Sequence, residues 1–331
     1  MAAWRPSAVS TFRVGRTAAR PAQRRRNAQE TRLDVGQIEH LEECVLIVRP
    51  PRRSTSRTIM TGPAAIPARR KKEVVHFSGT IPARMIYGLD LAYVHHAGFS
   101  EYARRTAPAV ARLLAAGQPF SRQARRRLPV IEFGSGGGTT ARYLSTRGFD
   151  VLGFDQSAAM VRLARRTAPR ARFAVGSLAS TPLPRCGAII ALGEVVNYLG
   201  DRRSIPAHDR GLFRFFARAA RALEPGGLLL FDFMESARHR TFDASARSGH
   251  DWVVVASARA EGASLTRHIT TIRNVSGRLR LSQEMHRVRL YRRRTIVAAL
   301  RSAGFRVVLR RSLGRVPVIR GDAVVVARRP S

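Results

Sequence analysis

Two segments of this 331-residue chain decide its fold: Val130-Ile131-Glu132-Phe133-Gly134-Ser135-Gly136-Gly137-Gly138 and Val151-Leu152-Gly153-Phe154-Asp155. Each begins as an apolar strand; the first continues into a glycine turn and the second ends in an acid. Glycine has no Cβ, so the backbone of such a turn can approach a ligand closely. Asp155 follows Gly138 by 17 residues, a separation at which a carboxylate can accept both hydroxyls of a ribose. The two segments therefore predict a nucleoside-binding edge on a parallel sheet.

Strands and helices alternate along the chain from residue 128 onward. Ser157 is a good N-cap for the helix that follows the second strand. The alternation predicts an α/β fold with a mostly parallel sheet flanked by helices. Short apolar runs predict its first five strands at 129–133, 150–154, 172–175, 188–192 and 228–233.

Residues 252–291 break this alternation. Three runs with polar alternation follow one another there, at Trp252–Ser257, Leu265–Ile272 and Leu279–Leu290. Consecutive strands without helices indicate an antiparallel excursion after the fifth strand. We expect this excursion to form a lid over the end of the sheet at which a substrate enters.

Two regions precede the main domain, which we expect to span residues 128–331. Residues 84–127 show a helical pattern and are expected to form an N-terminal helical cap, interrupted at Pro108. Residues 1–83 are rich in Arg, Pro, Ala and Ser. Such a composition predicts a disordered leader, or sequence upstream of a later start at Met60.

The formal net charge of +37 raises the question of a nucleic-acid partner. Only Lys71 and Lys72 are lysines, and so marked an arginine excess is typical of GC-rich coding bias as well as of phosphate binding. The arginines are dispersed and are not interleaved with aromatic side chains that could stack on bases. Nucleic acid is therefore a possible partner but not the favoured one. No apolar run is long enough to span a membrane.

Cysteine and histidine usage predicts a cytoplasmic protein without a metal site. Cys44 and Cys186 are the two cysteines of the chain, which is too few for a disulfide framework. The nine histidines show no spacing typical of zinc ligands. A reducing compartment is the simplest setting for such a chain.

The glycine loop and the segments after it resemble class I S-adenosylmethionine-dependent methyltransferases. The loop spacing is GxGxG rather than the GxGxxG of dinucleotide-binding loops, and Glu132 precedes it. An acid at that position disfavours a pyrophosphate and suits a ligand with an ammonium and a sulfonium. The resemblance implies a Rossmann-like, seven-stranded sheet and S-adenosyl-L-methionine as the cofactor. Further segments resemble the family in the same order: Leu152–Ser157, Val175–Leu178, Leu192–Leu199, Leu223–Leu229 and Ala303–Phe305.

The resemblance assigns eleven residues to the cofactor site. Glu132 would face the cofactor's amino group and Asp155 its ribose hydroxyls. Ser177 stands where many members have Asp, so the hydrogen bond to the adenine amino group would be absent or made by backbone. The residues near the methionine portion would be Glu132, Gly134, Ser135, Gly136, Gly138, Leu192 and Gly193, and those near the adenosine would be Asp155, Gln156, Ser177 and Leu178.

The sequence offers several candidates for a general base and singles out none. Glu194 stands just after the fourth strand, and His95 and His96 lie in the cap. His286 in the excursion is a further candidate. Each has the chemistry to accept a proton from an oxygen or nitrogen nucleophile, and each could instead orient a substrate or pack in the core. Tyr87 is expected to close over the cofactor or to pack in the core.

The sequence does not identify the methyl acceptor. Asn197-Tyr198 lacks the prolines that shape the acceptor pocket of DNA-base amino-methyltransferases, and Cys186 is not placed for a cysteine adduct with a cytosine. We therefore expect methyl transfer to an O or N atom of a small molecule by in-line displacement. The alternatives are an RNA or protein methyltransferase that uses the arginine-rich surface, and a non-catalytic S-adenosylmethionine-binding protein.

Overall fold

The computed structural model describes residues 34–35, 48–49, 86–117, 128–198, 205–236 and 241–331. The prediction for residues 1–83 therefore lies outside the described residues, except at two short strands. These are β1 (Asp34–Val35) and β2 (Val48–Arg49), which pair antiparallel. Among the helices that the structure describes, none is long and apolar enough to cross a membrane.

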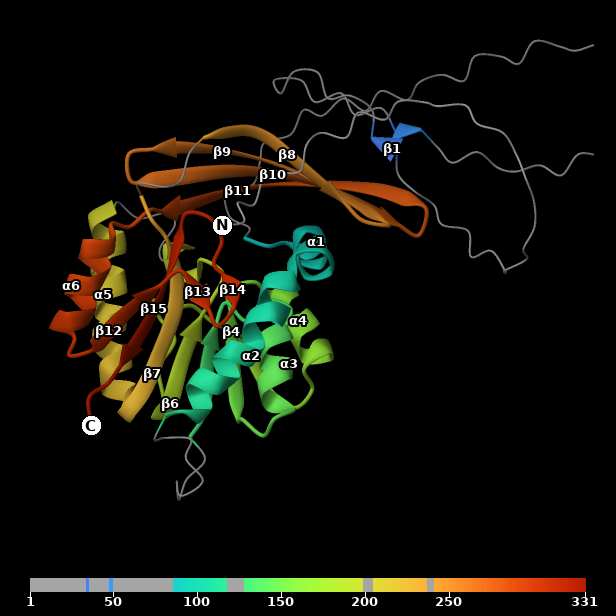
Figure 1. Ribbon diagram of the computed structural model, residues 1–331. Coiled ribbons are helices and arrows are strands. Elements are labelled where there is room, and N and C mark those ends of the chain that lie inside the picture. The colour runs from blue at the N-terminus through green and yellow to red at the C-terminus, as the bar shows by residue number, and fades with distance from the viewer. Residues whose placement is uncertain (1–33, 36–47, 50–85, 118–127, 199–204, 237–240) are drawn as a thin grey trace, which may run out of the picture. The chain divides into compact units, whose positions relative to one another are not determined.

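A seven-stranded sheet forms the centre of the main domain (Figure 1). The strand order is β12-β15-β7-β6-β3-β4-β5. β15 pairs antiparallel with β7 and β12, while the pairs from β7 to β5 are parallel. The predicted mostly parallel sheet of seven strands is thus confirmed. Its strands are β3 (Val130–Phe133), β4 (Val151–Asp155), β5 (Arg172–Val175), β6 (Cys186–Ala191), β7 (Leu223–Met234), β12 (Arg306–Arg310) and β15 (Asp322–Arg328).

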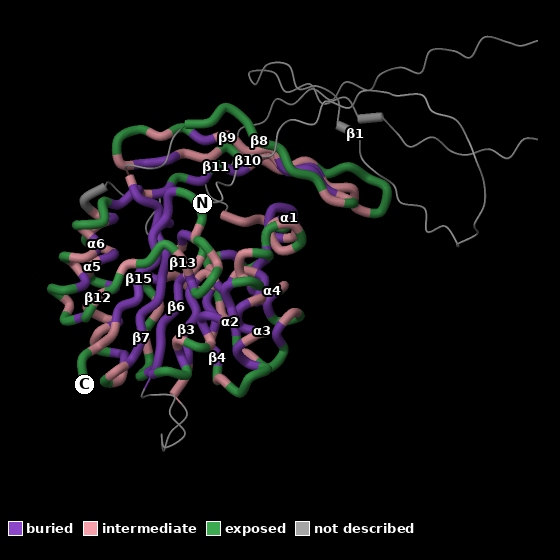
Figure 2. The backbone as a smooth tube through the Cα atoms, viewed as in Figure 1, coloured by how far each residue is buried: buried purple, intermediate pink, exposed green. Residues whose placement is uncertain are grey.

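Helices cover both faces of this sheet, as predicted. Successive strand side chains point to opposite faces, so Val130 packs in one buried cluster and Ile131 in the other. Figure 2 shows the central strands buried along their length. One face carries α2 (Glu101–Ala115), α3 (Thr139–Ser145) and α4 (Ala158–Thr167), and the other carries α5 (Ile205–Ala222) and α6 (Arg293–Ser302).

The N-terminal helices differ from the prediction at their break. Pro108 lies inside α2, and the break falls at Ser100, between α1 (Leu89–Phe99) and α2. The Ser100 hydroxyl donates to the carbonyl of His96 one turn earlier, a bond that competes with helix continuation. Pro108 removes the partner of the Arg104 carbonyl, but Arg104 is exposed, so water can satisfy that carbonyl.

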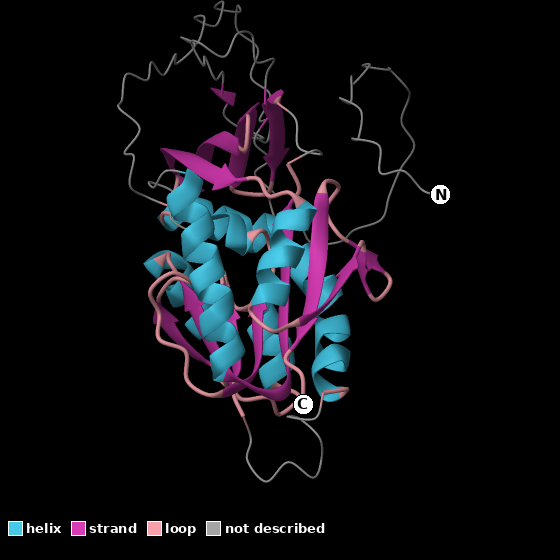
Figure 3. Cartoon of the chain, turned by 90° about the vertical axis from the view of Figure 1, so that its left-hand side faces the viewer, coloured by secondary structure: helices cyan, strands magenta, loops and turns pink. Residues whose placement is uncertain are grey.

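The antiparallel excursion is confirmed, with one strand more than predicted. All seven residues of β8 are exposed (Figure 2), and Phe242 is its single large apolar side chain. Gly262 and the pair Ser276-Gly277 adopt positive φ angles, which suit the two tight hairpins of the excursion. The four strands lie at one end of the helix-covered sheet (Figure 3). In the order β11-β10-β9-β8 they are β11 (Arg278–Arg289), β10 (Ser264–Val275), β9 (Trp252–Glu261) and β8 (Phe242–Ser248).

Two short elements complete the described part of the chain. The 3-10 helix η2 (Val195–Tyr198) follows β6, and the small hairpin β13 (Ser312–Leu313) and β14 (Val316–Pro317) connects β12 to β15. Asn197 of η2 donates to the carbonyl of Arg289 at the end of β11 and accepts from the amide of Met234 at the end of β7. These two bonds tie the excursion to the carboxyl end of the central sheet.

Candidate active site

Packing against other residues explains two of the glycines in the loop after β3, and the third has open space beside it. Gly134, Gly136 and Gly138 have φ angles of 63°, 52° and 81°, a region that glycine adopts without strain. A Cβ at Gly134 would lie 2.2 Å from a methyl carbon of Val195, and one at Gly138 would lie 2.9 Å from the Cα of Ala164. A Cβ at Gly136 would meet only a carbonyl oxygen at 4.0 Å. Packing therefore requires two of the glycines, and Gly136 leaves room for a ligand.

Asp155 joins this loop to the helix that follows. One carboxylate oxygen accepts from the Gly136 amide at 2.9 Å, and the other accepts from the Ser157 amide at 2.9 Å. Ser157 caps α4 as predicted, because its hydroxyl accepts from the Met160 amide at 3.1 Å. Burial raises the pKa of Asp155 above its ordinary value, and the two backbone bonds oppose that rise. A carboxylate has more lone pairs than these two donors use, so it can also accept from ribose hydroxyls.

Glu132 lies on β3 directly before the loop and is only 5% exposed. Its Oε2 has no hydrogen-bond partner among the described residues. Burial, opposed by a hydrogen bond with Thr140 and reinforced by the neighbouring Asp155, raises its pKa to about 8. A buried carboxylate with one oxygen unpartnered is unfavourable, and an ammonium beside that oxygen would lower the penalty. The site thus fits the amino group of S-adenosylmethionine at this point.

The predicted adenosine-binding residues lie at the ends of β4 and β5. Gln156 is exposed beside Asp155. The Ser177 hydroxyl lies 2.9 Å from that of Ser180, and its amide donates to Thr181 Oγ1 at 3.0 Å. Leu178 is 3% exposed and belongs to the core cluster, so it offers little surface to a purine. Backbone groups and the exposed Gln156 are therefore better placed than Leu178 to contact an adenosine.

Arg218 of α5 holds the loop after β5 through hydrogen bonds to its backbone. Its guanidinium donates to the carbonyls of Leu178 at 2.6 Å, Ala179 at 2.7 Å and Thr181 at 3.2 Å. Sequence reasoning missed this residue, because one arginine on a helix in an arginine-rich chain carries no distinguishing signal. The three bonds fix the carbonyls of the segment that faces the adenine in the predicted arrangement.

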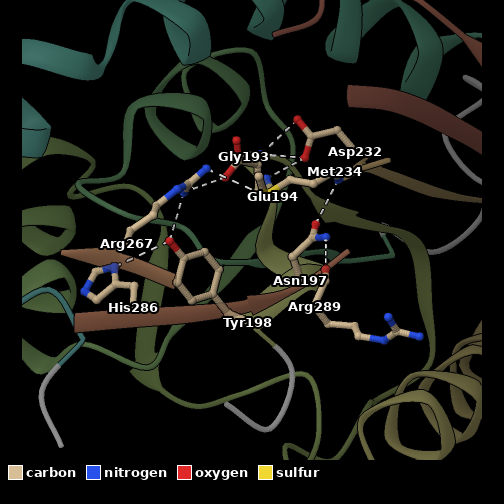
Figure 4. Close-up of polar contacts among 9 residues, drawn as sticks. All are labelled: Gly193, Glu194, Asn197, Tyr198, Asp232, Met234, Arg267, His286 and Arg289. Carbon is tan, nitrogen blue, oxygen red and sulfur yellow. Dashed lines mark hydrogen bonds and ion pairs between the residues drawn. The ribbon is translucent and has the colours of Figure 1, made fainter. Parts of the chain in front are cut away.

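Asp232, at the end of β7, holds the turn after β6 (Figure 4). It is fully buried and accepts from the amides of Gly193 at 2.8 Å and Glu194 at 2.7 Å, and from the Tyr102 hydroxyl at 3.2 Å. Burial first, and then the nearby Asp322, raises the pKa of Asp232 to about 7, against the effect of the two backbone bonds. A single acid in the apolar run of β7 is the sequence signal that could have identified it.

The turn held by Asp232 presents Glu194 to the excursion. Glu194 has a φ of 63°, an uncommon conformation for a residue other than glycine that concentrates at functional sites. Its carboxylate forms a 2.8 Å ion pair with Arg267 of β10 (Figure 4). Half-buried Leu192 and exposed Gly193 precede it, and a Cβ at Gly193 would meet no atom within 4 Å. This opening lies where the methionine channel was predicted.

The candidate histidines of α1 face different parts of the site. The His95 ring lies edge-on to the Tyr87 ring at 5.1 Å. Burial lowers the pKa of His95 to about 4, with smaller lowering effects of His96 and His286 and an opposing effect of Glu194, so His95 is neutral near pH 7. His96 packs on the glycine loop instead: a Cβ at Gly137 would lie 2.0 Å from its Nδ1. Gly137 therefore accommodates this ring.

His286 lies on β11 and its ring is near two tyrosine rings. The ring centroids of Tyr87 and Tyr198 are 5.1 Å and 5.7 Å from that of His286. His286 Nε2 lies 2.8 Å from Glu284 Oε2, and His286 Nδ1 lies 3.5 Å from the Tyr198 hydroxyl. The structure thus brings His95, His286 and the Glu194 turn into one neighbourhood.

Neither a metal cluster nor a reactive thiol marks the described part of the site. Among the described residues, no group of three or more His, Cys, Asp or Glu side chains could hold a metal ion. Burial, followed by the nearby Glu224, raises the pKa of the Cys186 thiol to about 12. A thiol so far from ionisation is a poor nucleophile near pH 7, and Cys186 serves as a core residue.

Comparison with known proteins supplies the family. A family model described as a methyltransferase domain matches residues 98–310, and no curated protein matches. The solved structures that resemble this chain include an S-adenosylmethionine-dependent methyltransferase from Clostridium acetobutylicum, which is 12% identical (TM-score 0.58, 72% of this chain and 96% of that one). A sugar N-methyltransferase from a Streptoalloteichus species is 18% identical (TM-score 0.58, 77% and 100%). An amino pentose methyltransferase from Micromonospora echinaspora, with S-adenosylmethionine bound, is 20% identical (TM-score 0.57, 74% and 98%).

At these identities the solved structures show the fold, and the family model shows the membership. The match covers more than half of the chain. The sheet order agrees with it, as do the open glycine loop and the buried acid before that loop. This chain therefore belongs to the class I S-adenosylmethionine-dependent methyltransferases, and S-adenosylmethionine is its cofactor.

Proposed function

We propose that this protein transfers the methyl group of S-adenosylmethionine to an amine or hydroxyl of a polar small molecule by in-line displacement. One observation carries the proposal. The excursion places Arg267 in a 2.8 Å ion pair with Glu194, beside the open backbone of Gly193 at the carboxyl edge of the sheet. Buried polar side chains at such an edge supply the few oriented contacts by which a site recognises a small polar ligand.

The eleven residues assigned by resemblance are the proposed cofactor ligands. Glu132 and Asp155 carry most of this assignment, since one is a buried acid with an unpartnered oxygen and the other faces the glycine loop. The cofactor supplies an electrophilic methyl group on a sulfonium. Asp232 and Arg218 join the proposed site as residues that hold its two flanking loops.

The excursion and the N-terminal helices are the proposed lid and cap of the acceptor site. Glu284 of β11 accepts from the amides of Tyr87 at 2.7 Å and Gly88 at 2.8 Å, at the start of α1. Arg273 of β10 forms a 3.1 Å ion pair with Asp90 of the same helix. These bonds hold the two elements together on one side of the site, which favours an enclosed acceptor over an extended polymer.

The pairing of the arginines also favours a small molecule over RNA. Arg289 pairs with Asp209 at 3.1 Å, and Arg293 and Arg311 pair with Glu235 at 2.8 and 2.7 Å. Arginines occupied by internal acids contribute less to a surface that could neutralise phosphates. The solved sugar N-methyltransferase and amino pentose methyltransferase act on sugars by their names, and amino sugars are therefore the first acceptors to test. A cytoplasmic location stays a prediction from the cysteine usage.

An acceptor screen tests the proposal. The full chain is incubated with S-adenosylmethionine and, separately, with amino sugars, the matching hydroxyl sugars, a transfer-RNA pool and a basic protein. We expect release of S-adenosylhomocysteine and a mass increase of one methyl group with a small molecule. Methylation of the RNA or the protein alone would contradict the proposal, and cofactor binding without turnover on any acceptor would favour the non-catalytic alternative.

A further inference from the structure

Three buried side chains outside the cofactor residues form a hydrogen-bonded row beside the Glu194 turn. They are Tyr198 of η2 and His286 and Glu284 of β11, which are 8%, 1% and 4% exposed. Tyr198 Oη lies 3.5 Å from His286 Nδ1, and His286 Nε2 lies 2.8 Å from Glu284 Oε2. At the other end, Arg267 donates to Tyr198 Oη at 3.3 Å (Figure 4).

The partners of Glu284 determine which nitrogen of His286 carries the proton. The Glu284 carboxylate already accepts from two backbone amides, those of Tyr87 and Gly88. An ionised carboxylate only accepts hydrogen bonds, so the 2.8 Å contact assigns the proton of a neutral His286 ring to Nε2. In the neutral ring Nδ1 is then an acceptor, and it faces the Tyr198 hydroxyl. The hydrogen bonds of the row therefore run in one direction: the tyrosine hydroxyl donates to the imidazole, and the imidazole donates to the carboxylate.

Charged and titratable groups from several of the described elements lie around this row. Glu194 and Arg267 stand at its open end, and Tyr87 and His95 lie beside it from the segment before α1 and from α1 itself. Burial raises the pKa of Tyr198 above its ordinary value, with an opposing effect of Arg267. Tyr198 is thus a neutral phenol near pH 7, and it can accept a proton only if it passes its own to another group. His286 is that group.

We propose that Tyr198, His286 and Glu284 form a proton relay that deprotonates the ammonium of the methyl acceptor. This inference rests on the proposed function. The open end carries Glu194 and the tyrosine hydroxyls beside Arg267, and the acceptor in this proposal is an amine that arrives protonated. One N–H proton of the acceptor moves to Tyr198 Oη while the hydroxyl proton of Tyr198 moves to His286 Nδ1, and Glu284 stabilises the imidazolium. The freed nitrogen lone pair then forms the bond to the methyl carbon, and the electron pair of the breaking carbon–sulfur bond returns to sulfur.

The tautomer can be tested without turnover. In the full chain with ¹⁵N-labelled histidine, we expect His286 to show a protonated Nε2 and an unprotonated Nδ1, and Tyr198→Phe to shift the Nδ1 resonance. The His286→Asn variant assigns the signal. A protonated Nδ1, or an Nδ1 signal that does not change in Tyr198→Phe, would overturn the relay.

Rates test its role in catalysis. With an amino sugar as the acceptor, Tyr198→Phe and His286→Asn should lower kcat roughly 100-fold or more near pH 7, with calorimetric cofactor affinity unchanged within about twofold. Their kcat should then rise about tenfold per pH unit toward pH 9.5, as the acceptor deprotonates without help, and the deficit should narrow. His268→Asn, an exposed histidine on the neighbouring β10, is the matched control and should keep the wild-type rate.

The outcomes separate a failure of the relay from a failure of the proposed function. A deficit of the same size at all pH values, or one accompanied by lost cofactor affinity, would show a merely structural role and overturn the relay. A protein that binds the cofactor and methylates neither an amine nor a hydroxyl contradicts the proposed function itself, whereas methylation of hydroxyls alone, or wild-type rates in His286→Asn, contradicts the relay alone.

Discussion

Glu132 makes cofactor affinity depend steeply on pH. Burial, together with Asp155, raises the pKa of this carboxyl to about 8 in the free protein, while the expected partner is the ammonium of the cofactor. Only the carboxylate form of Glu132 binds that ammonium well, so the apparent affinity scales with the ionised fraction. This fraction is roughly 1% at pH 6 and roughly 10% at pH 7. The dissociation constant should therefore fall about tenfold between pH 6 and pH 7.

The rise in affinity should end near pH 8. An α-amino group ordinarily loses its proton with a pKa of about 7.7–8.0, so the cofactor begins to lose its own charge as Glu132 completes its ionisation. The pH profile of binding should be bell-shaped. Isothermal titration calorimetry in buffers of different ionisation enthalpy measures both the affinity and the protons released.

Glu132→Gln isolates the carboxylate from the shape of the side chain. At pH 6 the wild-type carboxyl is mostly protonated, so the amide should bind the cofactor about as well. At pH 8 the variant should bind at least tenfold more weakly than the wild type, because the ion pair is missing. Glu261→Gln, at an exposed hairpin position, should follow the wild-type profile. Wild-type affinity that is flat from pH 6 to 8, or the same slope in Glu132→Gln, would refute the reasoning.

Three further predictions concern the loops and their buried acids. Asp155→Ala should weaken cofactor binding by roughly tenfold or more in calorimetry, since the ribose hydroxyls lose a charge-assisted hydrogen bond; unchanged affinity would contradict the ribose assignment. Arg218→Met should raise the dissociation constant of the cofactor about three- to tenfold and leave kcat at saturation nearly unchanged, because three carbonyls lose their donor. Glu132 and Asp232 both have a folded-state pKa above the ordinary value, so their contribution to stability is present below about pH 4 and lost as pH rises. The melting temperature without cofactor should fall from pH 5 to 8 in the wild type, and in Glu132→Gln the fall should stop near pH 7; identical curves would contradict this linkage.

Elements whose pattern is local were predictable from the sequence. The strand Arg172–Val175 and the helix N-cap at Ser157 were predicted where the structure has them. Buried parallel strands are continuous apolar runs, and surface helices show an apolar stripe, so both leave a record in a few consecutive residues. β8 leaves no such record, since all of its residues are exposed.

The acceptor side of the site was predictable only as a set of candidates. Glu194, His95 and His286 were identified by type, but their partners depend on contacts between distant segments. Glu284 meets Tyr87 across 197 residues, and no spacing in the sequence indicates such a contact. The helix break lies at Ser100 rather than at Pro108, a difference that the proline alone did not indicate.

Net charge proved a poor guide to this site for a physical reason. The chain has 59 basic residues and 22 acidic ones, yet acids build the site: Asp155, Asp232 and Glu284 each accept from two backbone amides. An inward-facing amide needs an acceptor, and the guanidinium of an arginine has none to offer. The turns that surround a ligand therefore require carboxylates even in a chain dominated by arginine. Composition describes the solvated majority of the charges, whereas binding and catalysis depend on the buried minority.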